Sequence, residues 1–238
     1  MTGIVVFGAA MAAGAIQAVT GFGAGIIMML FFPSFFPVLE AGALSAAINL
    51  TATGATSWKY RKKIEFRLTV VPSVFFIFAA TAALSLVSYV STDILLKLFG
   101  AFLVMLSIYF LTTSGNLNVR GILLTAGICS LISGVASGLF GIGGPPMVVY
   151  FLAVLQDKKR YLGTIQFFFF ITGSYNFILR ILKGIYTAKM IPYTLLGIVA
   201  VMIGKHIGEK IVDRINRDTM QKVIYVFLGL TGLMNLFG

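Results

Sequence analysis

The sequence predicts an all-α polytopic membrane protein with two inverted repeats, each a Gly/Pro-broken hairpin followed by three transmembrane helices. Hydrophobic residues make up 59% of the 238 positions, and charged residues make up 11%. The mean hydropathy is +1.01, and several apolar runs reach the length of about 20 residues that a helix needs to cross a hydrocarbon core. The longest polar stretch, residues 205–218, is too short for a soluble domain, so the chain reads as one membrane domain.

An internal repeat divides this domain in two. A shift of 120 residues places Gly21 and Gly23 on Gly141 and Gly143. The same shift places a proline of the first half on a proline of the second. The sequence therefore predicts one transmembrane repeat over residues 1–118 and a second over residues 119–238.

Each half opens with an apolar run that is too long for one crossing and that contains its own break. The first run, residues 3–39, carries the glycine-rich stretch from Thr20 to Gly25. The second, residues 121–155, carries a break from Ser137 to Pro146 with four glycines and two prolines. Glycine permits positive φ, and proline opposes a helix before it. Irregular backbone at membrane depth is tolerated where protein or a water-filled cavity surrounds it, so each break is a candidate binding site.

Three ordinary spans follow each break. In the first half we expect them over residues 41–58, 68–90 and 94–113, and in the second over 161–182, 190–208 and 219–237.

The distribution of basic residues indicates how the breaks cross the membrane. If each broken segment crossed once, the 18 Lys and Arg residues would fall nine on each side. If each is a hairpin, fourteen share one side, and the other four are Lys97, Arg180, Lys183 and Lys189. The positive-inside rule favours the hairpins. The protein is then expected in the cell (inner) membrane, with both termini on the outer side. Each half then has an odd number of full crossings, which makes the repeat inverted, as in many secondary transporters.

Several function classes are excluded by composition. The excess of 18 Lys and Arg over 7 Asp and Glu is explained by cytoplasmic loops, so nucleic acid is not an expected partner. Cys129 is the single cysteine, which leaves no thiol pair. An intramembrane protease would need a buried Ser-His pair, Asp pair or metal site, and the one histidine, His206, lies at a predicted helix edge. We therefore expect no enzyme, no metal and no cofactor.

The chemistry of the breaks suits a small anion. Backbone N–H groups in a glycine turn form an anion-binding concavity, and a helix that starts after a break points its positive dipole end at it. Polar side chains near mid-span can complete the site, or can instead bond neighbouring helices. The expected substrate-binding residues lie in or near the two breaks and on one face of the following span. They are Gln17, Thr20, Gly21, Phe22, Gly23, Asn49, Thr53, Gly141, Gly143, Gly144, Pro145, Gln166 and Asn176.

Arg180 and the acidic residues bear on mechanism. Arg180 lies near a helix end, where we expect it to snorkel to the interface, with substrate contact as the alternative. All seven acidic residues fall in loops or at span ends, so none is placed to carry a proton through the membrane. Glu40, directly after the first hairpin, is the nearest exception.

The paired glycine breaks resemble those of the TauE/SafE family of sulfite and sulfonate exporters. The similarity extends over essentially the whole chain, with Gly-Phe-Gly in the first break, Gly-Gly-Pro-Pro in the second, Arg160 opening the next span, and residues 204–209 before the last. Two positions depart from the fuller pattern of three consecutive glycines: Ala24 interrupts the first copy, and Pro145 replaces a glycine of the second. The resemblance implies export of a small sulfur oxyanion or organosulfonate.

These observations predict a membrane transporter that exports a small anion through a site between two Gly-rich broken hairpins. Its expected partners are the anion and the lipid bilayer. An anion channel, a permease for small carboxylates and a non-transporting membrane scaffold remain as alternatives.

Overall fold

The computed structural model describes most of the chain as helix. The described residues are 1–86, 91, 94, 97–98, 100–102, 104–105, 107–108, 123–211, 229–230 and 232–233. The expected spans over 94–113 and 219–237 lie largely outside them.

The first half begins with two helices, α1 and α2, that are separated by the first break. Its helices are α1 (Thr2–Thr20), α2 (Ala24–Phe31), α3 (Val38–Lys59) and α4 (Phe66–Leu86), with short 3-10 turns at Phe32–Ser34 and Arg61–Lys63. The second half repeats this order with α6 (Leu123–Phe140), α7 (Gly144–Val154), α8 (Lys158–Leu182) and α9 (Ile191–Ile211), and a 3-10 turn at Ala188–Met190. The predicted spans over 41–58, 68–90, 161–182 and 190–208 therefore correspond to α3, α4, α8 and α9 to within a few residues, and residues 87–90 lie outside the described part of the chain.

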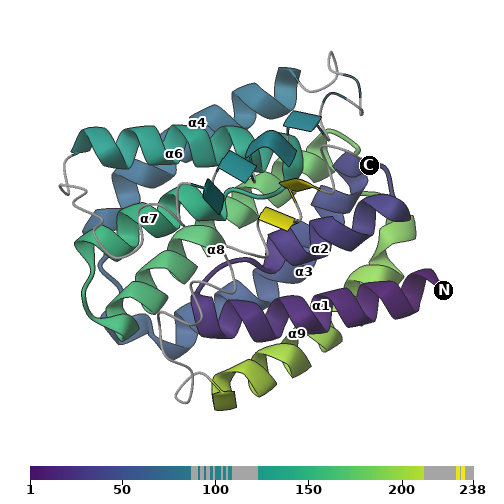
Figure 1. The fold of residues 1–238 in the computed structure, drawn as a ribbon, viewed down its shortest axis with the longest axis horizontal. Coiled ribbons are helices and arrows are strands. Elements are labelled where there is room, and N and C mark those ends of the chain that lie inside the picture. Colours follow the sequence, from purple (N-terminus) through teal and green to yellow (C-terminus); the bar gives the residue numbers. More distant parts are fainter. Residues whose placement is uncertain are drawn as a thin grey trace.

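Each broken segment is one full-length helix followed by a short one. Helix α1 has 19 residues and α6 has 18, whereas α2 has 8 and α7 has 11. At 1.5 Å per residue, α2 and α7 reach only about 12 and 16 Å, roughly half of a hydrocarbon core. Helix α2 turns back along α1 from the first break (Figure 1). This arrangement is what the hairpin interpretation requires of the first segment.

Five helices of the described chain are long and apolar enough to cross a membrane, namely α1, α4, α6, α8 and the Ala188–Lys210 segment, which contains all but the last residue of α9. The protein is therefore a multi-pass helical membrane protein. Helix α3 has 22 residues but lower hydropathy, because its sequence includes Asn49, Thr53 and Thr56. Those polar residues are accommodated because α3 packs in the interior against α8 rather than at the rim.

Two close helix pairs form opposite edges of the molecule: α1 lies against α9, and α4 against α6 (Figure 1). Glycines make both contacts possible. A Cβ on Gly14 of α1 would collide with the carbonyl oxygen of Val201, and one on Gly134 of α6 would lie 2.5 Å from that of Phe76. Gly134 follows Gly14 by 120 residues, and Phe76 precedes Val201 by 125. The first helix of each half thus packs on α4 or α9 of the other half.

Candidate functional site

The two breaks are shorter than the sequence suggested. Each consists of three residues, Gly21–Gly23 in the first half and 141–143 in the second. The expected ten-residue break from Ser137 to Pro146 is wrong in extent, because its ends are helical. Pro145 and Pro146 stand in the first turn of α7, where a missing N–H costs no helical hydrogen bond.

Glycine is required at these breaks for different reasons. Gly21, Gly23 and Gly141 have φ of +81°, +94° and +73°, a region that L side chains rarely adopt. Gly143 has φ of −117°, so a positive φ is not its role. A Cβ on Gly143 would instead lie 2.5 Å from the carbonyl oxygen of Ser133 and 2.8 Å from the ring of Phe76. Gly143 is therefore needed for close packing.

The breaks meet in the interior and line one pocket. A Cβ on Gly25 would lie 3.4 Å from the carbonyl oxygen of Gly141, and one on Gly144 would lie 3.7 Å from Phe22. The pocket has a cavity volume of about 70 Å³. Since a water needs roughly 10–15 Å³ by this measure, the cavity would hold only a handful of waters or one small solute.

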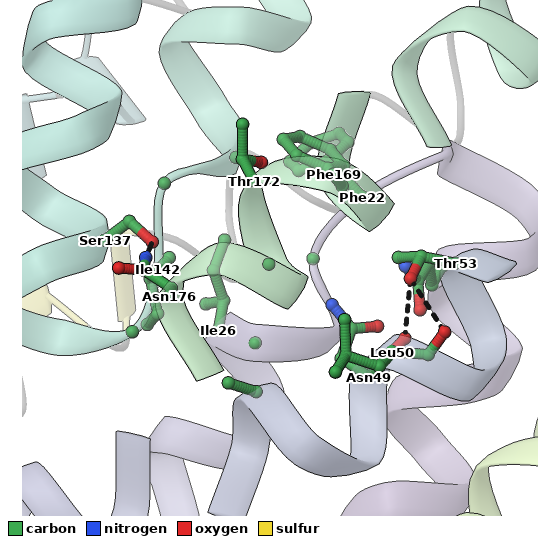
Figure 2. A pocket seen from close by; sticks show the side chains of 18 of the residues that line it. Phe22, Ile26, Asn49, Leu50, Thr53, Ser137, Ile142, Phe169, Thr172 and Asn176 are labelled. Carbon is green, nitrogen blue, oxygen red and sulfur yellow. Dashed lines mark hydrogen bonds between the residues drawn. The ribbon is translucent and has the colours of Figure 1, made fainter. Parts of the chain in front are cut away.

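Nine of the thirteen expected site residues line this pocket: Gln17, Phe22, Gly23, Asn49, Thr53, Gly141, Gly143, Gly144 and Asn176. Figure 2 shows Asn49 and Thr53 of α3 on one side of the space, and Ser137 of α6 with Asn176 of α8 on the other. Asn176 donates a hydrogen bond to the Ser137 hydroxyl.

The other four expected residues lie just behind the pocket wall. The Thr20 hydroxyl closes the first break: it accepts from the Phe22 N–H, and its one hydrogen lies within reach of the carbonyl oxygens of Ile16 and Phe22. Pro145 is buried in α7. Gln166 donates to the Gly21 carbonyl at 2.7 Å and accepts from Gln17 at 3.2 Å. Gly21 and Gln166 thus support the wall without forming it. The bond to Gly21 fixes which end of each amide is the donor, so Oε1 of Gln17 remains a buried acceptor without a partner in the described structure.

Eleven other residues line the pocket and were not among the thirteen expected substrate-binding residues. They are Gly25, Ile26, Ala46, Leu50, Phe76, Ser137, Ile142, Phe169, Thr172, Gly173 and Arg180. The internal repeat carried a signal for some of them, because Ser137 is Gln17 shifted by 120 and Phe169 is Asn49 shifted by 120. Phe76 had no such signal, since α4 reaches the pocket through its packing on α6 and α8, where the Phe76 ring contacts that of Phe168.

The expectation that Arg180 snorkels to the interface is wrong. Its side chain is fully buried and lines the pocket. Nη1 donates to the Leu39 carbonyl at 2.9 Å, and Nη2 donates to those of Ser137 and Gly138 at 3.2 and 3.0 Å. The side chain thus points inward, where three carbonyls bind the guanidinium; two of them belong to the last turn of α6, the negative end of that helix dipole.

The half-helices add positive potential to the same space. The first turn of α2 presents the N–H groups of Ala24, Gly25 and Ile26, for which an α-helix has no internal acceptor. In α7 the two prolines remove two of the corresponding donors. Among the lining residues Arg180 is the one charged side chain, and none is acidic. The site is therefore electropositive, and its chemistry is suited to a small anion.

A comparison of the whole chain with protein-family models gives a match to the model described as Sulfite exporter TauE/SafE, over residues 6–235. Searches of the curated proteins and of the solved structures gave no significant match.

Proposed function

Because the chain belongs to the TauE/SafE family of sulfite exporters, we propose that it exports sulfite or a small organosulfonate by binding the anion between its two breaks. The observation that carries this proposal is the pocket bordered by both breaks and by Arg180. Its volume of about 70 Å³ suits an anion the size of sulfite better than a sulfonate with a long carbon chain. Backbone N–H groups at the start of α2 would bind the anion's oxygens without a second buried cation.

The proposed architecture is an inverted repeat of residues 1–118 and 119–238 in the cell membrane, with both termini outside. Equivalent contacts, in which each half packs on the other in the same way, support this architecture. Gly21 packs against Leu162, and Gly141 packs against Gly42, which is Leu162 shifted back by 120 residues. The α1–α9 and α4–α6 pairs are related in the same way. A site at the interface of such repeats can be exposed alternately to either side when one half rocks against the other.

Sulfite efflux from proteoliposomes tests this function. The purified protein is reconstituted with sulfite inside at a mildly acidic pH, where the monovalent hydrogen sulfite predominates and little neutral sulfur dioxide is present to cross the bilayer unaided. We expect efflux that exceeds that of protein-free liposomes, saturates with sulfite concentration, and is inhibited by methanesulfonate more than by acetate.

The alternatives give different results. A channel would conduct without saturating at low concentrations. A carboxylate permease would carry acetate in preference to sulfite. A scaffold would release none of these anions, and that result would overturn the proposal.

A further inference from the structure

Arg180 is a buried cation with spare hydrogen-bonding capacity. A guanidinium has five N–H donors, and three of them bind the carbonyls of Leu39, Ser137 and Gly138. Nε is buried and has no partner among the described residues. At least one further Nη hydrogen is also unassigned, so the group can still donate to a ligand in the pocket that it lines.

The charge of Arg180 is also incompletely balanced. The ion pairs in the described chain are Lys59–Glu209, Arg160–Glu65 and Lys205–Glu209, and none involves Arg180. Its partners are neutral carbonyls, and the end of α6 supplies only about half of a negative charge. A buried cation without a counterion is costly, and a bound anion would offset that cost.

We propose that Arg180 selects monovalent anions, with the bound substrate serving as its counterion. This inference rests on the proposed function, because it assumes that the pocket is the substrate site. A monovalent oxyanion such as hydrogen sulfite or an alkylsulfonate completes a neutral pair with the guanidinium. A dianion of the same size leaves one negative charge buried among apolar walls formed by Phe22, Ile26 and Phe169.

Methanesulfonate and sulfate provide a matched pair for the test, because they are similar in size and tetrahedral shape and differ by one charge. Their binding to the purified full chain in detergent is measured by isothermal titration calorimetry at constant ionic strength. We expect methanesulfonate to bind more tightly than sulfate by about tenfold or more, because no second cationic side chain among the described residues lines the pocket to balance the second charge of sulfate. Equal or tighter binding of sulfate, or binding of neither anion, overturns the proposal.

Variants separate charge selection from a structural role. Arg180→Gln is expected to lose methanesulfonate binding, whereas Arg180→Lys keeps the charge and is expected to keep the preference at reduced affinity. Lys183→Gln removes an exposed positive charge just beyond the same helix and is expected to leave binding unchanged. If Arg180 only ties the helices together, Arg180→Gln will lower thermal stability without changing the ratio of the two affinities. If Arg180→Gln fails to fold, the binding of the two anions to the unmodified protein, together with Arg180→Lys, still tests whether the site prefers the monovalent anion.

The calorimetry also distinguishes this inference from the proposed function. Selective methanesulfonate binding without sulfite efflux would refute transport and keep the monovalent site. Sulfite efflux with sulfate bound as tightly as methanesulfonate would keep the transport function and refute the selection of monovalent anions.

Discussion

Gly141 packs so closely on Gly42 that a Cβ on Gly141 would lie 3.0 Å from the Gly42 Cα. The contact joins the second break to α3, the helix that follows the first broken segment. The neighbouring Nη1 of Arg180 lies 3.3 Å from where a Cβ on Gly42 would be. Gly42 therefore leaves the space in which the guanidinium sits, and Gly141 leaves the space that lets the second break approach Gly42.

Gly143→Ala is expected to abolish sulfite efflux. Its Cβ would meet the Ser133 carbonyl oxygen at 2.5 Å and the Phe76 ring at 2.8 Å, so α7 would have to move away from α6 and reshape the pocket. Gly8→Ala in α1 is the matched control, because its Cβ would have no neighbour within 4 Å. Efflux assays and size-exclusion profiles of both variants check this. Full activity of a folded Gly143→Ala would show that this contact is unimportant.

Substitution of Gly23 tests whether backbone strain, and not steric contact, makes glycine necessary there. Its φ is +94°, but the nearest atom to a Cβ there would be 3.6 Å away. Gly23→Val is expected to destabilise the protein by about 1–2 kcal/mol or more, and Gly23→Asn by less, because Asn tolerates the left-handed region. Thermal unfolding in detergent gives the comparison. Equal losses for Val and Asn would indicate that space, not φ, is limiting.

Gln166→Leu is expected to cost about 1–3 kcal/mol, because it leaves the Gly21 carbonyl and the Gln17 amide buried without partners. Gln156→Leu replaces an exposed glutamine just before the same helix and is the control. Unfolding midpoints of the two variants are compared at one detergent concentration. A similar unfolding midpoint for the two variants would mean that water takes over the hydrogen bonds of the lost Gln166 amide.

The orientation of the membrane domain is tested by cysteine labelling in a Cys129→Ala background. Lys62 and Lys189 are both exposed, the first after α3 and the second before α9. If both termini are outside, an impermeant maleimide on intact cells should label Lys189→Cys and spare Lys62→Cys until the cells are opened. The opposite pattern would reject the orientation, and labelling of both positions would reject the hairpin model.

The last prediction concerns coupling. Glu40 lies in the first turn of α3 beside Leu39, whose carbonyl binds Arg180. If the substrate's own charge drives transport, Glu40→Gln should leave the pH dependence of efflux unchanged. An inside-negative potential set with potassium and valinomycin should accelerate efflux, since 100 mV is worth about 2.3 kcal/mol per charge. Loss of the pH dependence in Glu40→Gln, together with indifference to potential, would assign proton transfer to this carboxylate.

The sequence alone determined the class of the protein and the places where its helices break. Apolar runs of membrane length and glycine-rich stretches are local properties of the chain, and the repeat at 120 residues can be read from the sequence directly. Together they locate α3, α4, α8, α9 and both breaks without any knowledge of tertiary contacts. The side chains nearest the breaks, such as Gln17 and Asn49, were predictable for the same reason.

Only the tertiary structure decided what surrounds those breaks. Whether Arg180 points outward or inward depends on carbonyls of Leu39 and Ser137, which lie 141 and 43 residues away in the chain. Phe76 reaches the pocket because α4 packs on α6, and Gln166 stands behind the wall because Gly21 offers it an acceptor. Such contacts arise from the packing of distant helices, and no periodicity within one helix encodes them.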